Sequence, residues 1–146
     1  MKINYSKVYF IGIGGIGMSS IALYFLNGGK LVGGYDKTKT DLTLSLSKKG
    51  AIINYELNSN IIPGQFKDKK NTLVVYTPAI SKDNIQLDYF IKNGFNILKR
   101  SQILGVISKN KFCIAIAGTH GKTTTSTILS HLLYENNVSF TSFIGG

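Results

Sequence analysis

The sequence predicts an α/β fold built on a parallel, doubly wound sheet. Short apolar runs alternate with helical patterns along most of the chain. These runs are continuous and do not alternate with polar residues, which is typical of strands buried on both faces. Two glycine-rich loops each stand between such a run and a helical pattern. With 146 residues, 43% of them hydrophobic, the chain is long and apolar enough to bury a core.

The expected elements follow from these patterns in chain order. Strands are expected at residues 8–13, 31–35, 51–54, 72–77, 95–98 and 112–117, with a last one entering the glycines at 143–146. Helices are expected at residues 18–26, 41–49 and 84–93, and also in the segment that Ser101 caps, which carries Ile103, Leu104 and Ile107. A final helix follows the second loop, with Ile128, Leu129, Leu132 and Leu133 on one side. Residues 56–71 are polar and ambiguous, with a turn at Pro63-Gly64.

The first glycine loop has the G-x-G-x-x-G spacing at Gly12, Gly14 and Gly17. Glycines so spaced permit a tight turn, a close approach of the backbone to a diphosphate, and close packing of helix on strand. Asp36 ends the next strand, where its carboxylate can accept hydrogen bonds from ribose hydroxyls. Alone, this loop indicates an NAD-dependent oxidoreductase. The simplest alternative is a glycine-rich packing turn with Asp36 as an ordinary acid at a strand end.

The second loop, Gly118-Thr119-His120-Gly121-Lys122-Thr123-Thr124, has the composition of a phosphate-binding loop. Backbone N–H groups and the helix dipole favour an anion there, and Lys122 adds a full positive charge. The hydroxyl of Thr123 is placed to ligate a magnesium ion held by the same phosphates. The strict P-loop pattern asks for a further glycine where Ile116 stands. A glycine turn with an exposed lysine is the alternative.

The composition adds weaker indications. The net charge is +10, but the lysines are spread along the chain and no aromatic-basic RNA-binding signature is present, so nucleic acid is not an expected partner. The one cysteine, Cys113, lies in the apolar run before the second loop and is expected to be buried. No disulfide within the chain is possible, which favours a cytoplasmic location. Residues 8–29 are uncharged, but the clustered glycines favour a turn over a membrane helix.

The two loops divide the chain into a Rossmann-like parallel sheet domain, residues 1–108, and the start of a P-loop ATPase domain, residues 109–146. Only one helix and one strand fit after Lys122, which is too little to complete an ATPase domain. We therefore expect the chain to be the N-terminal part of a longer protein.

The order and separation of the loops resemble the Mur ligases of peptidoglycan synthesis. The resemblance is carried by the two loops and by three shorter motifs, which are Gly34-Tyr35-Asp36, Thr77-Pro78-Ala79-Ile80-Ser81 and Lys99-Arg100-Ser101. These motifs span nearly the whole chain. Members of the family that ligate a murein tripeptide have similar loops, so the loops favour the family over any one member.

The resemblance implies an ATP-dependent ligase that joins L-alanine to UDP-N-acetylmuramate through an acyl phosphate, with ATP and Mg²⁺ as cofactors. It implies that the UDP-sugar binds at Gly12, Gly14, Gly15, Gly17, Met18 and Asp36. ATP would bind at Gly118, Thr119, His120, Gly121, Lys122, Thr123 and Thr124, with Lys122 catalytic and Thr123 a metal ligand. His120 is expected to shape the loop, and His131 to be a packed or surface residue.

The resemblance also implies that the magnesium-binding glutamate, the adenine pocket and the amino-acid domain lie beyond Gly146, so that this part alone does not ligate. An NAD-dependent oxidoreductase and a non-enzymatic nucleotide-binding module remain the alternatives. The sequence gives no oligomeric state.

Overall fold

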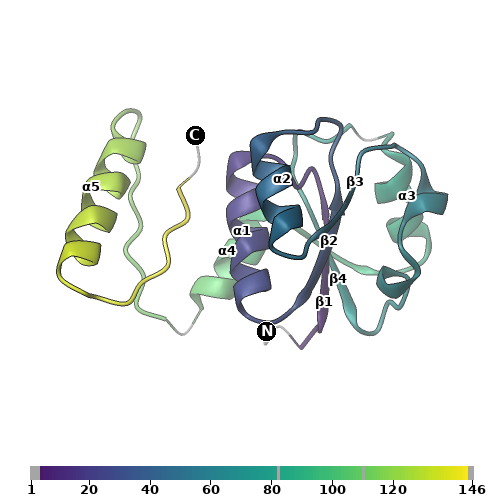
Figure 1. The fold of residues 1–146 in the computed structure, drawn as a ribbon, viewed down its shortest axis with the longest axis horizontal. Coiled ribbons are helices and arrows are strands. Elements are labelled where there is room, and N and C mark those ends of the chain that lie inside the picture. Colours follow the sequence, from purple (N-terminus) through teal and green to yellow (C-terminus); the bar gives the residue numbers. More distant parts are fainter. Residues whose placement is uncertain (1–3, 82, 110, 145–146) are drawn as a thin grey trace.

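The computed structural model describes residues 4–81, 83–109 and 111–144. Its centre is a parallel sheet of five strands in the order β3-β2-β1-β4-β5 (Figure 1). The strands are β1 (Lys7–Ile11), β2 (Leu31–Tyr35), β3 (Ile52–Asn54), β4 (Thr72–Tyr76) and β5 (Asn96–Lys99). Every neighbouring pair is parallel. The predicted Rossmann-like sheet is therefore confirmed.

Helices cover both faces of this sheet (Figure 1). The helices are α1 (Ile16–Asn27), α2 (Asp41–Lys48), α3 (Ile85–Lys92), α4 (Arg100–Ser108) and α5 (Lys122–Glu135), with two short 3-10 turns, η1 (Ser59–Ile61) and η2 (Gly64–Phe66). α1, α2 and α4 pack on one face, and α3 with the two 3-10 turns packs on the other. Side chains alternate between the two faces along each strand, so both faces of β1 and β4 are buried.

Two apolar clusters result from this layering. On one face, Val8 and Phe10 of β1 pack with Val75 of β4 against α1 and α4. On the other face, Tyr9 and Ile11 of β1 pack in one cluster with Leu87 and Phe90 of α3. The continuous apolar runs of the sequence thus mark strands that are covered on both sides, as predicted.

The predicted elements of the sheet domain are confirmed to within about two residues at each end. One cap was predicted wrongly, because α4 begins at Arg100 and its N-cap is Lys99, so Ser101 already lies inside the helix. The Lys99 N–H donates to Gln102 Oε1 at 2.7 Å, so the cap of α4 stands two positions earlier than expected. The ambiguous stretch 56–71 contains η1 and η2.

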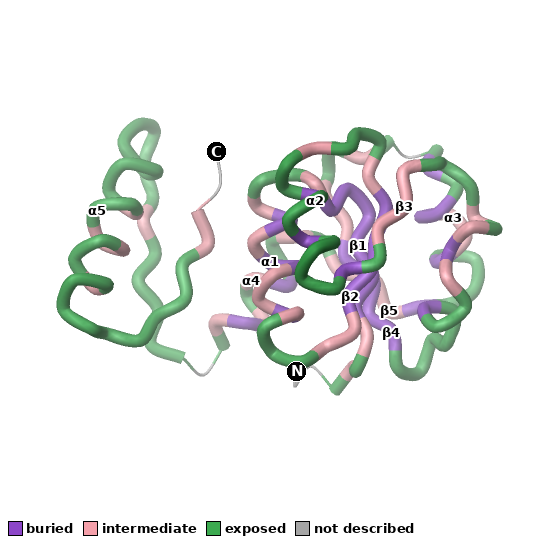
Figure 2. The backbone as a smooth tube through the Cα atoms, in the orientation of Figure 1, coloured by how far each residue is buried: buried purple, intermediate pink, exposed green. Residues whose placement is uncertain are grey.

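The strand expected at residues 112–117 is wrong for this structure. The segment pairs with no strand among the described residues, and Phe112 is 94% exposed. Cys113 is exposed for the same reason, contrary to the expected burial. An apolar run becomes a buried strand only where neighbouring backbone and side chains cover it, and here such cover is missing (Figure 2).

The apolar side expected for α5 is also only partly right. Leu129 and Leu133 are half-buried, whereas Ile128 and Leu132 remain 56% and 54% exposed. No strand forms at 143–144, and residues 145–146 lie outside the described part of the chain. Within the described ranges, no helix is both long and apolar enough to cross a membrane.

Candidate functional site

The first candidate site lies at the carboxyl edge of the sheet, where β1 and β4 are neighbours. The chain leaves β1 for α1 on one face of the sheet, and leaves β4 for α3 on the other. In open parallel sheets, the loops that separate at such a reversal of strand order leave a crevice in which ligands bind. The first glycine loop is the β1–α1 connection and therefore forms one side of this position.

Gly12 makes the turn out of β1. Its φ of 84° lies in the left-handed region, which a residue with a Cβ adopts only at a cost. A Cβ at this position would also stand 2.9 Å from Cγ2 of Thr77 and 3.1 Å from Cδ1 of Ile80, both in the loop that follows β4. The glycine thus allows the two loops on either side of the crevice to touch.

Asp36, at the end of β2, holds the loop in place. Its Oδ2 accepts the N–H of Gly14 at 2.7 Å, and its Oδ1 accepts the N–H of Thr38 at 3.0 Å. A Cβ on Gly14 would stand 2.8 Å from that Oδ2, so the carboxylate sits directly against the loop. Each carboxylate oxygen already has a backbone donor, and the side chain acts in this structure as a brace for the glycine turn.

The amides that remain available in the first loop are those of Ile16 and Gly17. Gly12 and Ile13 donate to Tyr35 O, and Gly15 donates to Gly12 O. Within the described ranges, Ile16 N–H and Gly17 N–H have no acceptor, as is usual for the first turn of a helix. The sequence analysis named Gly17 but missed Ile16, because every residue type except proline has a backbone N–H and the type of residue 16 therefore gives no sign of a donor there. Met18 is buried under the loop, and its N–H donates to Gly15 O.

The second candidate site is the loop before α5. Gly121 is the N-cap of α5, with a φ of 79° that again favours glycine, and the helix begins at Lys122. Thr125 N–H donates to Gly121 O at 2.9 Å and so closes the first turn of the helix. In the described part of the chain, none of the amides of residues 118–124 has an acceptor. The loop therefore presents a run of free donors at the positive end of a helix dipole.

Lys122 folds back across this loop. Its Nζ donates to Gly118 O at 2.7 Å and to Thr119 O at 3.2 Å. An ammonium group has three donors, so one remains for a ligand. The ammonium of Lys122 is thus bonded to the same loop that carries the free amides, and phosphate binding there stays a prediction.

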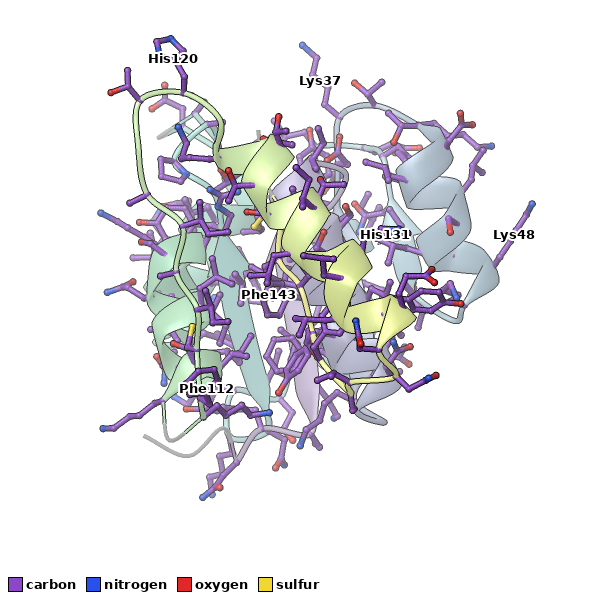
Figure 3. All side chains as sticks on the ribbon, turned by 90° about the vertical axis from the view of Figure 1, so that its left-hand side faces the viewer. Lys37, Lys48, Phe112, His120, His131 and Phe143 are labelled. Atoms are coloured by element: carbon purple, nitrogen blue, oxygen red, sulfur yellow. The ribbon has the colours of Figure 1, made fainter. Side chains whose placement is uncertain are left out.

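The two histidines of the chain lie in the second loop and on the helix that follows it. The His120 side chain stands at the tip of the loop and points away from the rest of the molecule (Figure 3). His131 is exposed on α5, where its Nδ1 lies 4.0 Å from Oε1 of Glu135. His131 is thus a surface residue, one of the two positions expected for it, and the role of His120 in shaping the loop stays a prediction.

For a metal ion, the described residues offer little beyond Thr123. They contain no group of three or more histidine, cysteine, aspartate or glutamate side chains that could hold one. Thr123 stands in the first turn of α5 with an exposed side chain. This fits a Mg²⁺ ion whose other ligands come from phosphate oxygens, from water and from residues outside the described part.

Both loops lie at the same end of the molecule. In Figure 1 the first turns of α1 and α5 are both at the upper end, and Figure 3, turned by 90°, shows His120 and Lys37, which follows β2, at that same end. The two groups of free amides therefore open toward one side, from separate elements.

Comparison with known proteins gives a consistent result. Residues 7–112 match the Mur ligase family, catalytic domain. The chain is 52% identical to the "UDP-N-acetylmuramate--L-alanine ligase" of Parabacteroides distasonis, over 100% of this chain and 32% of the relative. It is also 52% identical to the protein of that name in Flavobacterium psychrophilum, over 96% of this chain and 31% of the relative.

A solved structure agrees with these relatives. The "UDP-N-acetylmuramate-alanine ligase" of Thermotoga maritima matches with a TM-score of 0.79 and 32% identity, over 90% of this chain and 30% of that one. The chain spans about a third of the length of the curated relatives it matches. The resemblance inferred from the two loops is confirmed, and the chain belongs to the Mur ligase family.

Proposed function

We propose that this chain is the N-terminal part of an ATP-dependent ligase that joins L-alanine to UDP-N-acetylmuramate in peptidoglycan synthesis. The names of its relatives in Parabacteroides distasonis, Flavobacterium psychrophilum and Thermotoga maritima support this reaction. Residues 1–108 would hold the UDP-sugar, and residues 109–146 would begin the ATP-binding domain. A cytoplasmic location, where both nucleotides are available, belongs to the same proposal.

The observation that carries the proposal is the position of Lys122 over the second loop. A dehydrogenase needs one glycine loop for its dinucleotide, and such a lysine has no part in hydride transfer. Here Lys122 Nζ is held by Gly118 O and Thr119 O beside seven consecutive free amides, residues 118–124. This arrangement supports a site for the phosphates of a second nucleotide and disfavours the oxidoreductase alternative.

The chemistry of the proposed reaction fits such a site. A carboxylate oxygen of the muramyl group attacks the γ-phosphorus of ATP, the bond to the ADP oxygen breaks, and an acyl phosphate forms. The amine of L-alanine then attacks the acyl carbon, phosphate leaves with the bonding electrons, and the amine loses a proton. The first step brings one anion onto another, so its main requirement is neutralisation of charge.

The residues of this chain supply part of that neutralisation. The ammonium of Lys122 and the free amides of residues 118–124 would face the β- and γ-phosphates. Thr123 would contribute its hydroxyl to Mg²⁺, which when bound offsets the negative charge of the same phosphates. Gly12, Gly14 and Gly15 would shape the first loop, with Asp36 as its brace. Ile16 and Gly17 would donate their N–H groups to the diphosphate of the sugar nucleotide.

The proposal is tested by replacing Lys122 in the full-length protein. We expect Lys122→Ala to lower ATP-dependent formation of phosphate by about a thousandfold or more, since a cation at a transferring phosphoryl group contributes on that scale. Binding of UDP-N-acetylmuramate, measured by calorimetry, should be unchanged because it occurs at the other loop. Lys48→Ala, which removes an exposed lysine at the end of α2, is the matched control and should leave both quantities unchanged.

Ligation by Lys122→Ala at the wild-type rate would refute the assignment of the second loop. A protein that binds UDP-N-acetylmuramate and ATP without turning either over would instead be a nucleotide-binding module. Tight binding of NAD with release of the UDP-sugar would favour the oxidoreductase.

A further inference from the structure

We propose that Arg100 is a further ligand-binding residue of the first site, where its guanidinium group binds the diphosphate of the UDP-sugar. The inference rests on the proposed function and adds to it a residue from a different element of the fold. Arg100 is the first residue of α4 and directly follows β5, so it starts from the same carboxyl edge of the sheet as the first glycine loop.

The guanidinium group of Arg100 lies against Gly17. A Cβ built on Gly17 would collide with Nη1 of Arg100 and would stand 3.1 Å from Cζ. Gly17 lies inside α1 and has no positive φ, so its backbone does not require glycine. The missing side chain instead leaves the space that the guanidinium fills. The third glycine of the motif therefore admits an arginine in this chain.

This placement is electrostatically unfavourable unless an anion is bound. The guanidinium lies at the first turn of α1, which carries the positive end of the helix dipole. That turn contains no acidic residue. No carboxylate of the described ranges lies within ion-pair distance of Arg100, and the carboxylate of Asp36, which braces the same glycine loop, is engaged by two backbone amides. Two positive groups thus face each other without a counter-charge, as expected for an anion site.

Two free backbone donors stand in the same first turn of α1 that the guanidinium contacts. The N–H of Gly17 and that of Ile16 are the free amides of the loop. A planar guanidinium can donate two parallel hydrogen bonds to phosphate oxygens, which an ammonium cannot. Arg100 is the only arginine in the sequence, and the other permanently charged basic side chains are all lysines. The geometry fits a phosphate group held between the start of α1 and the start of α4.

The test measures how the effect of one variant depends on the phosphates of the ligand. In the full-length protein, Arg100→Met keeps a long side chain and removes the charge. We expect its dissociation constant for UDP to rise by about tenfold to a hundredfold, as for the loss of a charged hydrogen-bonding partner. The constant for uridine, measured by ligand-observed NMR, should stay the same. Arg100→Lys should fall between the wild type and Arg100→Met.

Two further variants separate binding from folding. Lys109→Ala removes a positive charge at the opposite end of α4 and should leave UDP affinity unchanged. Gly17→Ala would shift the end of the Arg100 side chain and should weaken UDP binding by less than Arg100→Met does, while uridine affinity is retained. Melting temperatures without ligand show whether any variant has lost structure.

The outcomes are distinct. If Arg100→Met binds UDP as tightly as the wild type, or weakens UDP and uridine binding equally, the inference is wrong and the proposed function stands. If the wild-type protein itself binds neither UDP nor UDP-N-acetylmuramate, the proposed function fails and the inference fails with it.

Discussion

At the scale of single residues, Tyr9 shows how a polar group is accommodated in the middle of the core. Its hydroxyl donates to Oε1 of Gln86 at 2.8 Å and accepts from Nδ2 of Asn54 at 2.8 Å. Nε2 of Gln86 in turn donates to Glu56 O and Asn58 O. The network ties β1, the end of β3, the loop after it and α3 together. Its position under the sheet depends on the strand order, so the sequence alone did not reveal it.

Removing this hydroxyl should destabilise the protein. Tyr9→Phe leaves Gln86 Oε1 without its donor and Asn54 Nδ2 without its acceptor, and Gln86 is fully buried, so water does not replace the lost donor there. We expect the free energy of unfolding to fall by about 1–3 kcal/mol, measured by urea denaturation at neutral pH. Tyr134→Phe is the matched control, because Tyr134 is 72% exposed. Equal stability of the two variants would show that the Tyr9 network contributes nothing.

The pH dependence of the same variant gives a second readout. Burial raises the pKa of Tyr9 above its ordinary value of 10.0, and the hydrogen bond from Asn54 only partly opposes this. On raising the pH, the unfolded chain therefore loses the phenol proton before the folded chain does. The stabilisation is fully present below pH 10.0 and is lost as the pH rises above it. The stability difference between wild type and Tyr9→Phe should shrink over that range.

At the scale of elements, α2 shows how a short helix is started by its own sequence. Thr40 is the N-cap, and its Oγ1 accepts the N–H of Thr43 at 3.3 Å. Oγ1 of Thr43 accepts the N–H of Thr40 at 2.9 Å, which completes a reciprocal capping box. Asp41 in the first turn and Lys48 in the last both suit the helix dipole. Such local signals explain why α2 was predicted with its first residue correct.

Removing this cap should weaken the protein measurably. We expect Thr40→Ala to reduce the free energy of unfolding by about 1 kcal/mol, because one N–H of the first turn loses its acceptor. Thr40→Ser should retain most of the stability. Thr38→Ala makes the same chemical change two positions earlier, at an exposed residue before the cap, and should have little effect. If chemical denaturation gives the same loss for Thr38→Ala and Thr40→Ala, the box does not stabilise α2.

Elements that depend on distant partners were predicted less well. β1 and β4 were identified from their apolar runs because the sheet and its helices cover both of their faces. Residues 112–117 have an equally apolar sequence, but they pair with no strand among the described residues, and all of them except the half-buried Ile116 are exposed. A sequence pattern states that burial is favourable, and only the neighbouring elements decide whether it occurs. Likewise, no local pattern places Arg100 against Gly17, since the contact follows from the order of β1, β4 and β5.

At the scale of the whole molecule, α1 connects the sheet domain to the part that carries the second loop. The ring of Tyr24 on α1 stacks edge-on with Phe143 at 5.7 Å, and Nζ of Lys111 lies 5.7 Å from the centre of the same ring. Phe143 packs against the core cluster to which α1 contributes. A cavity of about 600 Å³ lies beside this contact, lined by Tyr24, Lys30 and Thr141 among others. Among the described residues, the contacts of Phe143 and Lys111 with Tyr24 join the two parts.

The central claim is that the two loops bind separate nucleotides. Its most direct test is an amide NMR titration of the full-length protein, selectively labelled with nitrogen-15 in glycine and isoleucine. UDP-N-acetylmuramate should shift the signals of Ile16 and Gly17, and ATP with Mg²⁺ should shift those of Gly118 and Gly121, each without displacing the other. Displacement of the UDP-sugar by ATP, or shifts at the same loop with both ligands, would contradict the account.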